Sequence, residues 1–222
     1  MDFGAIYAET RERVADLTRN LAAADLEREV PATPGWRVCD VAAHLAGVAA
    51  DVLAGNLPGG PGEEWTAAQV ESRRACTIGE VLDEWADTAV ELEPKIAAAG
   101  PPMGFLVADV ATHEQDVRGA LRQSGFRDSA GVEAATQVMV GGVGRKLSAA
   151  NLALRLRSGV QEWELGEGDP AVSVSADPFE LFRALSGRRS ITQVARWAWD
   201  GDPGPYFGLI SIFPLRATDL VE

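Results

Sequence analysis

The chain has 222 residues, of which 46% are hydrophobic and 24% are charged, the balance of an ordinary globular protein. That length suffices for one large domain or two small ones. The net charge of −13, from 33 acidic and 20 basic residues, would repel phosphate backbones and anionic lipids. Nucleic-acid and membrane-surface binding are therefore disfavoured.

The sequence also indicates a compartment. No apolar run approaches the ~20 residues that span a bilayer, and MDFGAIYAETRERV lacks the basic start and apolar centre of a secretory signal. Cys39 and Cys76 lie far apart and form no CxxC pair, which favours a reducing environment over a disulfide framework or a cysteine zinc site. We therefore expect a cytoplasmic protein, with Cys39 as a small buried hydrophobe rather than a nucleophile.

Helical periodicity appears first in two segments separated by a break. The first helix is predicted from about Phe3 to Ala24, and PATPGW ends it. The second runs from about Arg37 to Leu53 and carries a broad apolar face. The GNLPGGPGEEW segment that follows is too rich in glycine and proline for a helix or strand and is predicted as a loop.

Two further helices complete the first half of the chain. Thr77 and Glu80 have the spacing of a capping box, which predicts a helix start at this point. This helix continues to about Ile96, with a kink or an early end at Pro94 as an open alternative. The fourth helix runs from about Gly104 to Leu121. Four amphipathic helices with one long and two short connections predict a four-helix bundle.

In the remaining residues, the spacing of apolar positions changes from helical to a mixture of helical and alternating segments. SAGVEAATQVMVGGVGRKLSA is predicted as a helix, and NLALRLRS, EWELGEG and AVSVSA alternate as strands do. DPFELFRALSGRR returns to helical spacing with Gly187 as a stop, whereas YFGLISIFPLRATDLVE fits a helix or a strand. The change between Gly125 and Asn151 predicts a second domain. We expect an α+β protein with a four-helix bundle over residues 1–125 and a small α+β domain over 126–222.

Both histidines of the chain lie in apolar helical segments close to carboxylates. Asp109 precedes His113 by four residues, so the two side chains project from one helix face, one turn apart. His44 lies at the edge of the apolar stripe of the second helix. Inward His and carboxylate groups on facing helices commonly build a metal site. The alternative is a pair of satisfied core histidines with Asp109 at a solvated rim.

Neighbouring residues have two interpretations each. Asp40 is predicted to cap the second helix, with orientation of His44 as the alternative. Asp116 is predicted to hold a ligand ring from behind or to pair with Arg118, in preference to binding a metal itself. Trp36 is interpreted as a packing residue at the helix entry, with a substrate-stacking role as the alternative.

Three segments resemble a known family. PGWRVCDVAAHLAG resembles the second-helix motif of the mycothiol-dependent maleylpyruvate isomerase branch of the DinB-like superfamily. ADVATHEQDVRGAL resembles that branch's later acid–histidine–aspartate motif, and FELFRALSGRRSITQVARWAWDGDP resembles its C-terminal domain, which is related to sterol-carrier folds. The resemblance covers nearly the whole chain in the correct order. It implies a DinB-like four-helix bundle followed by a small sterol-carrier-like α+β domain.

The resemblance also implies a site. It assigns His44, Asp109 and His113 as ligands of a divalent metal, with Zn²⁺ as the leading candidate, nickel or iron as alternatives, and an open position for water or substrate. It further implies that an arginine of the C-terminal domain reaches the active site. Arg188 and Arg189 are therefore the candidate catalytic residues for binding an anionic substrate, against the simpler interpretation of a solvated turn.

Two residues depart from the family pattern. Asp109 stands where the founding isomerase has glutamate, and its shorter side chain would alter the metal distance or the choice of metal. Arg37 replaces a small hydroxyl residue at the helix start, which predicts a weaker cap without loss of the site.

The implied function is that of a metal-dependent, mycothiol-dependent enzyme, a thiol S-transferase or a cis-trans isomerase, acting on a small electrophile. The thiolate would add to a double bond, allow rotation and leave, or would stay on the product in transfer. The alternatives are a metal-dependent hydrolase that uses metal-bound water and a non-enzymatic DinB-like binding or stress module. Expected partners are a small-molecule electrophile and a low-molecular-weight thiol, without nucleic acid or membrane. The sequence identifies neither the electrophile nor the oligomeric state.

Overall fold

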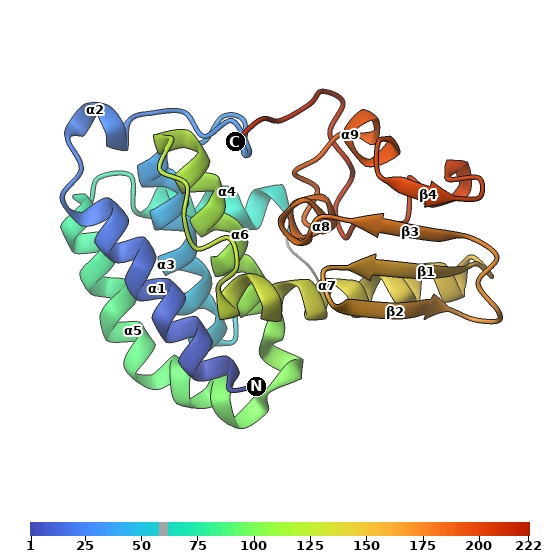
Figure 1. The fold of residues 1–222 in the computed structure, drawn as a ribbon. Helices are drawn as coiled ribbons and strands as arrows, with labels where there is room; N and C mark the ends of the chain where they lie inside the picture. The colour runs from blue at the N-terminus through green and yellow to red at the C-terminus, as the bar shows by residue number, and fades with distance from the viewer. Residues whose placement is uncertain (58–61) are drawn as a thin grey trace. The chain divides into compact units, whose positions relative to one another are not determined.

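The computed structural model describes residues 1–57 and 62–222. Within these residues the chain divides into two compact units, Met1–Gly125 and Phe126–Glu222. The first unit is helical, and the second combines helices with a sheet of four strands (Figure 1). The chain is therefore an α+β protein, as predicted.

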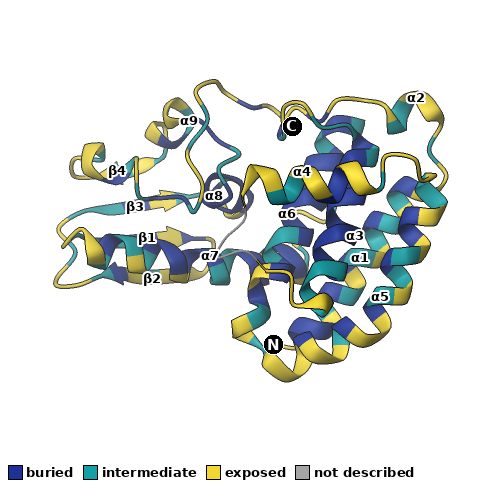
Figure 2. Ribbon diagram, turned by 180° about the vertical axis from the view of Figure 1, so that it is seen from behind, coloured by how far each residue is buried: buried dark blue, intermediate teal, exposed yellow. Residues whose placement is uncertain are grey.

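Four helices of the first unit form the predicted bundle: α1 (Phe3–Arg19), α3 (Val38–Ala54), α5 (Ile78–Ala99) and α6 (Gly104–Leu121). α1 packs against α5 and α6, and α3 packs against the same two helices, so the four enclose one core. α3 is buried along most of its length, as Figure 2 shows by its dark colour. The helix that carries His44 thus lies inside the unit.

The helix boundaries agree with the predictions in most places. α1 ends earlier than expected, and the short helix α2 (Ala23–Leu26) follows it. Thr77 and Glu80 form the predicted capping box, with the Thr77 backbone N 2.7 Å from Glu80 Oε2. α5 continues through Pro94, so an early end at that residue is wrong.

Helix α4 (Glu63–Ser72) is absent from the prediction. It begins inside GNLPGGPGEEW, so the loop prediction is wrong from Glu63 onward, while residues 58–61 of that segment lie outside the described residues. Glu63 and Glu64 occupy its first turn, where negative charge stabilises the helix. Only Gln69 and Val70 of this helix are buried, so its sequence carries no long apolar stripe.

The second unit contains the predicted helix and strands. Helix α7 (Ala130–Ala149) packs against β2 (Gln161–Gly166), which pairs antiparallel with β1 (Ala153–Ser158). β3 (Ser173–Ala176) runs parallel to β1, and β4 (Ala198–Asp200) pairs antiparallel with β3, which gives the order β2-β1-β3-β4. The sequence does not predict β4.

The C-terminal part of this unit follows the prediction less closely. Helix α8 (Pro178–Leu185) forms as expected and stops before Gly187, whose φ of 75° suits glycine. Helix α9 (Ile191–Ala195) is absent from the prediction. The YFGLISIFPLRATDLVE segment is neither a long helix nor a strand: after the 3₁₀ turn η2 (Gly204–Tyr206) it adopts irregular structure with one bridge from Arg216 to Ser190. No helix in the described part of the chain combines the length and apolar character needed to cross a bilayer.

Candidate metal centre

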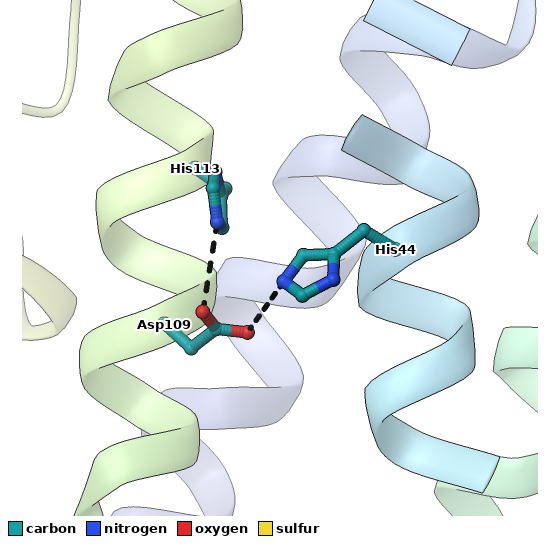
Figure 3. A group of neighbouring side chains, drawn as sticks. All are labelled: His44, Asp109 and His113. Carbon is teal, nitrogen blue, oxygen red and sulfur yellow. Dashed lines mark ion pairs between the residues drawn. The ribbon is translucent and has the colours of Figure 1, made fainter. Parts of the chain in front are cut away.

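Helices α3 and α6 bring His44, Asp109 and His113 together inside the first unit, and in Figure 3 the three side chains point toward one another. One donor atom from each lies within 4.8 Å of the other two. His44 Nε2 is 3.7 Å from Asp109 Oδ2, and His113 Nε2 is 3.6 Å from Asp109 Oδ1. The structure therefore brings together the three residues that were predicted as metal ligands.

The three side chains differ in burial. His44 and His113 are only 4% and 6% exposed, whereas the Asp109 side chain is 29% exposed. Asp109 is thus neither fully inside the core nor a solvated rim residue. Asp109 is the most exposed of the three residues.

The donor set fits a divalent ion. Ligand atoms ~2.0–2.1 Å from a tetrahedral zinc are about 3.3 Å apart, close to the two nitrogen–oxygen separations of 3.6 and 3.7 Å. Those separations are too long for hydrogen bonds. Two imidazoles and one carboxylate suit zinc, and also nickel or non-haem iron. Small side-chain movements would allow His44, Asp109 and His113 to bind one ion.

A residue of α4 contacts the outer side of His44. Gln69 Oε1 lies 2.8 Å from His44 Nδ1, and Gln69 Nε2 donates to Asp51 Oδ2 at 2.8 Å. Gln69 was not predicted as a site residue, because α4 itself was not predicted from the sequence. No motif or spacing in the sequence identifies this glutamine.

Asp116 lies behind His113. Its Oδ2 is 3.0 Å from His113 Nδ1, an ion-pair distance without full hydrogen-bond geometry, and its side chain is fully buried. Asp116 is thus on the far side of the ring from Asp109, and its role in holding the ring stays a prediction. Arg118 pairs with Glu114 at 2.9 Å.

Trp36 lies beside both histidine rings. Its ring centroid is 4.9 Å from that of His44 and 6.0 Å from that of His113. The indole is half-buried. Trp36 therefore forms an aromatic wall of the site, a position in which it packs against the ligand rings and keeps some surface open.

Comparison with known proteins identifies the family. The family model for the mycothiol maleylpyruvate isomerase N-terminal domain matches residues 7–123, more than half of the chain. This chain belongs to that family. A search of curated protein sequences found no significant match.

Two solved structures share the fold of this family member. They are crystal structures of the mycothiol-dependent maleylpyruvate isomerase and of a histidine mutant of that isomerase. Sequence identity is 14% and 13%, the TM-score is 0.57 in both comparisons, and each alignment covers 84% of this chain and 88% of the other. At this identity the likeness establishes a common fold.

The start of α3 in this family member is held by an unusual pair. Asp40 accepts a hydrogen bond from the Arg37 backbone N at 2.8 Å and two from the Arg37 guanidinium at 2.7 and 2.9 Å. Burial acts to raise the pKa of Asp40, but the Arg37 hydrogen bonds outweigh it and hold that pKa below its usual value. Asp40 caps the helix as predicted, and the expected weakening of the cap by Arg37 is wrong.

Tyr7 of α1 is a further buried group within electrostatic reach of Asp109. Its hydroxyl oxygen accepts a hydrogen bond from Trp85 Nε1 at 2.9 Å. Burial raises the pKa of the Tyr7 phenol well above its usual value, the Trp85 hydrogen bond partly offsets this, and the Asp109 charge raises it further. Tyr7 is therefore a neutral phenol at physiological pH. In the sequence it is indistinguishable from an ordinary core aromatic.

Arg188 and Arg189 lie in the second unit with different surroundings. Arg189 is 3% exposed and pairs with Glu180 at 2.6 Å and with Glu222 at 3.1 Å. Burial acts to lower the pKa of Arg189, but these carboxylates outweigh it and raise the pKa. Half-buried Arg188 donates to the Ser186 carbonyl oxygen at 2.7 Å. The solvated-turn interpretation is wrong for Arg189, and a role of either arginine in an active site stays a prediction.

Proposed function

We propose that this family member is a metal-dependent, mycothiol-dependent enzyme that acts on a small electrophile. The enzyme either transfers the thiol to the electrophile or isomerises the electrophile. The observation that carries the proposal is the convergence of His44, Asp109 and His113, with their donor atoms within 4.8 Å. The family match over residues 7–123 supports mycothiol as the thiol. Zinc is the proposed metal, because a set of three nitrogen and oxygen ligands with an open position is typical of catalytic zinc.

Each residue has a separate task in this proposal. A bound divalent ion would stabilise the thiolate form of the cosubstrate at neutral pH. His44 and His113 would supply neutral nitrogen ligands, and Asp109 would supply one negative charge from the solvent-facing side. Trp36 covers the flank of both rings and limits water there. Tyr7, as a neutral phenol, adds no charge to the site.

For an anionic electrophile, we assign substrate binding to Arg188 in preference to Arg189. Arg189 is already engaged by two carboxylates, so its guanidinium holds its own segment in place. Arg188 is half-buried and uses a backbone carbonyl among its partners. Arg188→Gln should then lower kcat/KM for an anionic electrophile at least about tenfold, the effect of losing a charged hydrogen bond, and should spare a neutral one.

The proposal is tested by turnover of a panel of electrophiles, maleylpyruvate included, with metal-loaded protein and with mycothiol present or omitted. We expect turnover only when metal and thiol are both present. Turnover that is unchanged without thiol would contradict the proposal and favour the hydrolase alternative, in which the ion lowers the pKa of bound water. Protein purified without a histidine tag that lacks stoichiometric metal and turns over no substrate would favour the non-enzymatic module.

A further inference from the structure

We propose that Gln69 and Asp51 form a positioning relay that holds the ring hydrogen of His44 on Nδ1 and leaves Nε2 available to a metal. This inference rests on the proposed metal site and assigns a function to helix α4, which the sequence does not predict. The relay runs from Asp51 on α3, through Gln69 on α4, back to His44 on α3. It acts on the ligand from the side opposite Asp109.

The direction of the relay follows from hydrogen-bonding capacity. An ionised carboxylate only accepts hydrogen bonds, whereas a glutamine amide has one accepting end and one donating end. With Asp51 Oδ2 2.8 Å away, the amide must turn its NH₂ group toward Asp51, and its oxygen then faces His44. The reversed amide would set two acceptors against each other. The carboxylate of Asp51 therefore decides which end of Gln69 meets the imidazole.

The amide orientation in turn decides the tautomer of His44. Gln69 Oε1 carries no hydrogen, so the contact of 2.8 Å requires His44 Nδ1 to donate. A neutral imidazole has one ring hydrogen, and its second nitrogen is then an acceptor or a metal ligand. That second nitrogen, Nε2, is the one that faces Asp109.

Packing between α3 and α4 allows Gln69 to approach His44 this closely. Gly47 lies on α3 one turn after His44, and a Cβ at that position would lie 2.6 Å from Gln69 Cβ and 2.7 Å from its Cγ. Only glycine leaves the space that Gln69 occupies. Arg73 Nη1 would lie 2.9 Å from the same added Cβ, and Arg73 donates to the Gln69 carbonyl oxygen at 3.1 Å and to Glu84 of α5 at 2.9 Å. α4 is thereby tied to α3 and α5 with its glutamine directed at the ligand.

His113 also has an acceptor close to its Nδ1, but this acceptor is the carboxylate of Asp116 and not an amide. Asp116 places a buried carboxylate 3.0 Å from His113 Nδ1, which favours the hydrogen on that nitrogen. Both rings thus have an acceptor behind Nδ1 and Asp109 in front of Nε2. The negative charge lies one contact away from His113 but two contacts away from His44, because a neutral amide intervenes.

The relay is tested with substitutions that remove it or reverse it. Gln69→Leu removes the acceptor. Asp51→Asn removes the charge that orients Gln69. The new side-chain amide can both donate and accept, so it can pair with either end of Gln69. The double variant Asp51→Asn with Gln69→Glu restores a directed chain, in which the new amide at position 51 donates to the new carboxylate at position 69, and that carboxylate accepts from His44. Ser72→Ala is the control on the same helix, because its hydroxyl donates to the Gln69 backbone oxygen at 3.0 Å and accepts from Arg73 at 3.1 Å, and both hydrogen bonds lie outside the relay.

Two readouts are needed, and neither is catalytic activity. The first is zinc affinity by competition with a chromophoric chelator. We expect Gln69→Leu to lower affinity about 10–100-fold, as loss of groups behind a ligand does, Asp51→Asn to lower it less, and the double variant to recover most of the loss. The second is the ¹⁵N spectrum of the imidazoles in metal-free protein, which has only two histidines. Wild type should show His44 with hydrogen on Nδ1, and Gln69→Leu a mixture of tautomers.

The proposal is overturned if Gln69→Leu leaves both the zinc affinity and the tautomer unchanged, or if the double variant binds zinc no better than Asp51→Asn alone. Melting curves and the Ser72→Ala control separate loss of the relay from loss of α4. Because the tautomer is measured without metal, the relay and the proposed function can be refuted independently of each other. A wild-type protein that binds no metal refutes the proposed function, whereas the tautomer of Gln69→Leu still decides the relay.

Discussion

Asp109 and Asp116 flank His113 on α6, but they face opposite edges of the imidazole. Asp109 is near Nε2 of both histidines, and Asp116 is near Nδ1 of one. We predict that Asp109→Asn abolishes or strongly weakens zinc binding, because asparagine keeps the shape but loses the charge that neutralises the ion. Asp116→Asn should retain most of the metal with lower affinity. Metal analysis of both variants under identical loading checks this, and retention by Asp109→Asn with loss by Asp116→Asn would contradict it.

At the level of single residues, the sequence predicts those site residues that stand out from a helical pattern of apolar positions. His44, Asp109 and His113 could be selected because they interrupt apolar helical faces, and two of them have helical spacing. Gln69 could not, since a glutamine in a segment without an apolar stripe has no signature. Tyr7 also could not, because its proximity to Asp109 arises only when α1 packs beside α6.

The N-terminus of α3 depends on the Arg37–Asp40 pair. We predict that Asp40→Asn lowers the free energy of unfolding by about 1 kcal/mol at pH 7, a typical value for a helix cap. The pKa of Asp40 is lowered in the folded state, so this contribution is complete above the ordinary aspartate pKa of about 3.9 and is lost as pH falls below it. Urea unfolding at several pH values measures it. A difference between the two proteins that grows on acidification would contradict the assignment.

The contact of α3 with α4 depends on Gly47. Gly47→Ala places a methyl group against Gln69, and we expect it to destabilise the protein by about 1–3 kcal/mol, as overpacking does, and to weaken zinc binding. Gly79→Ala is a matched control in α5, where the added Cβ approaches only Thr77 Oγ1, at 3.9 Å. Thermal unfolding and zinc competition report the two effects. Equal zinc affinity in both alanine variants would argue against a role for the close α3–α4 approach.

Among the elements, the most regular patterns are predicted best. α6 occupies Gly104–Leu121, the predicted range, because its apolar positions repeat without breakers. α4 is missed because it follows glycines and prolines and buries little apolar surface. The C-terminal segment after Tyr206 is apolar without being helical or extended along its length, since tertiary contacts replace regular hydrogen bonding. One such contact is the backbone bond from Ile212 N to the Leu185 oxygen at 2.8 Å.

At the scale of the whole protein, metal binding should couple to stability. The three ligands come from α3 and α6, so an ion would join two helices of the bundle core. A ligand that binds only the folded state stabilises it by about 2.7 kcal/mol at 100 times its Kd. We therefore predict that metal-loaded protein melts at a higher temperature than chelator-treated protein, and that His44→Ala removes this difference. Identical melting curves, with metal loss verified by elemental analysis, would count against the site.

The central claim is that His44, Asp109 and His113 hold an ion to which a thiol sulfur binds. The most direct measurement is the absorption spectrum of cobalt-substituted protein during titration with mycothiol, because a cobalt–thiolate bond produces a charge-transfer band that oxygen and nitrogen ligands do not. We predict that the band grows to saturation at one thiol per protein in wild type and is absent in Asp109→Asn. Cobalt that is bound stoichiometrically by wild type but develops no such band at any thiol concentration would contradict the account.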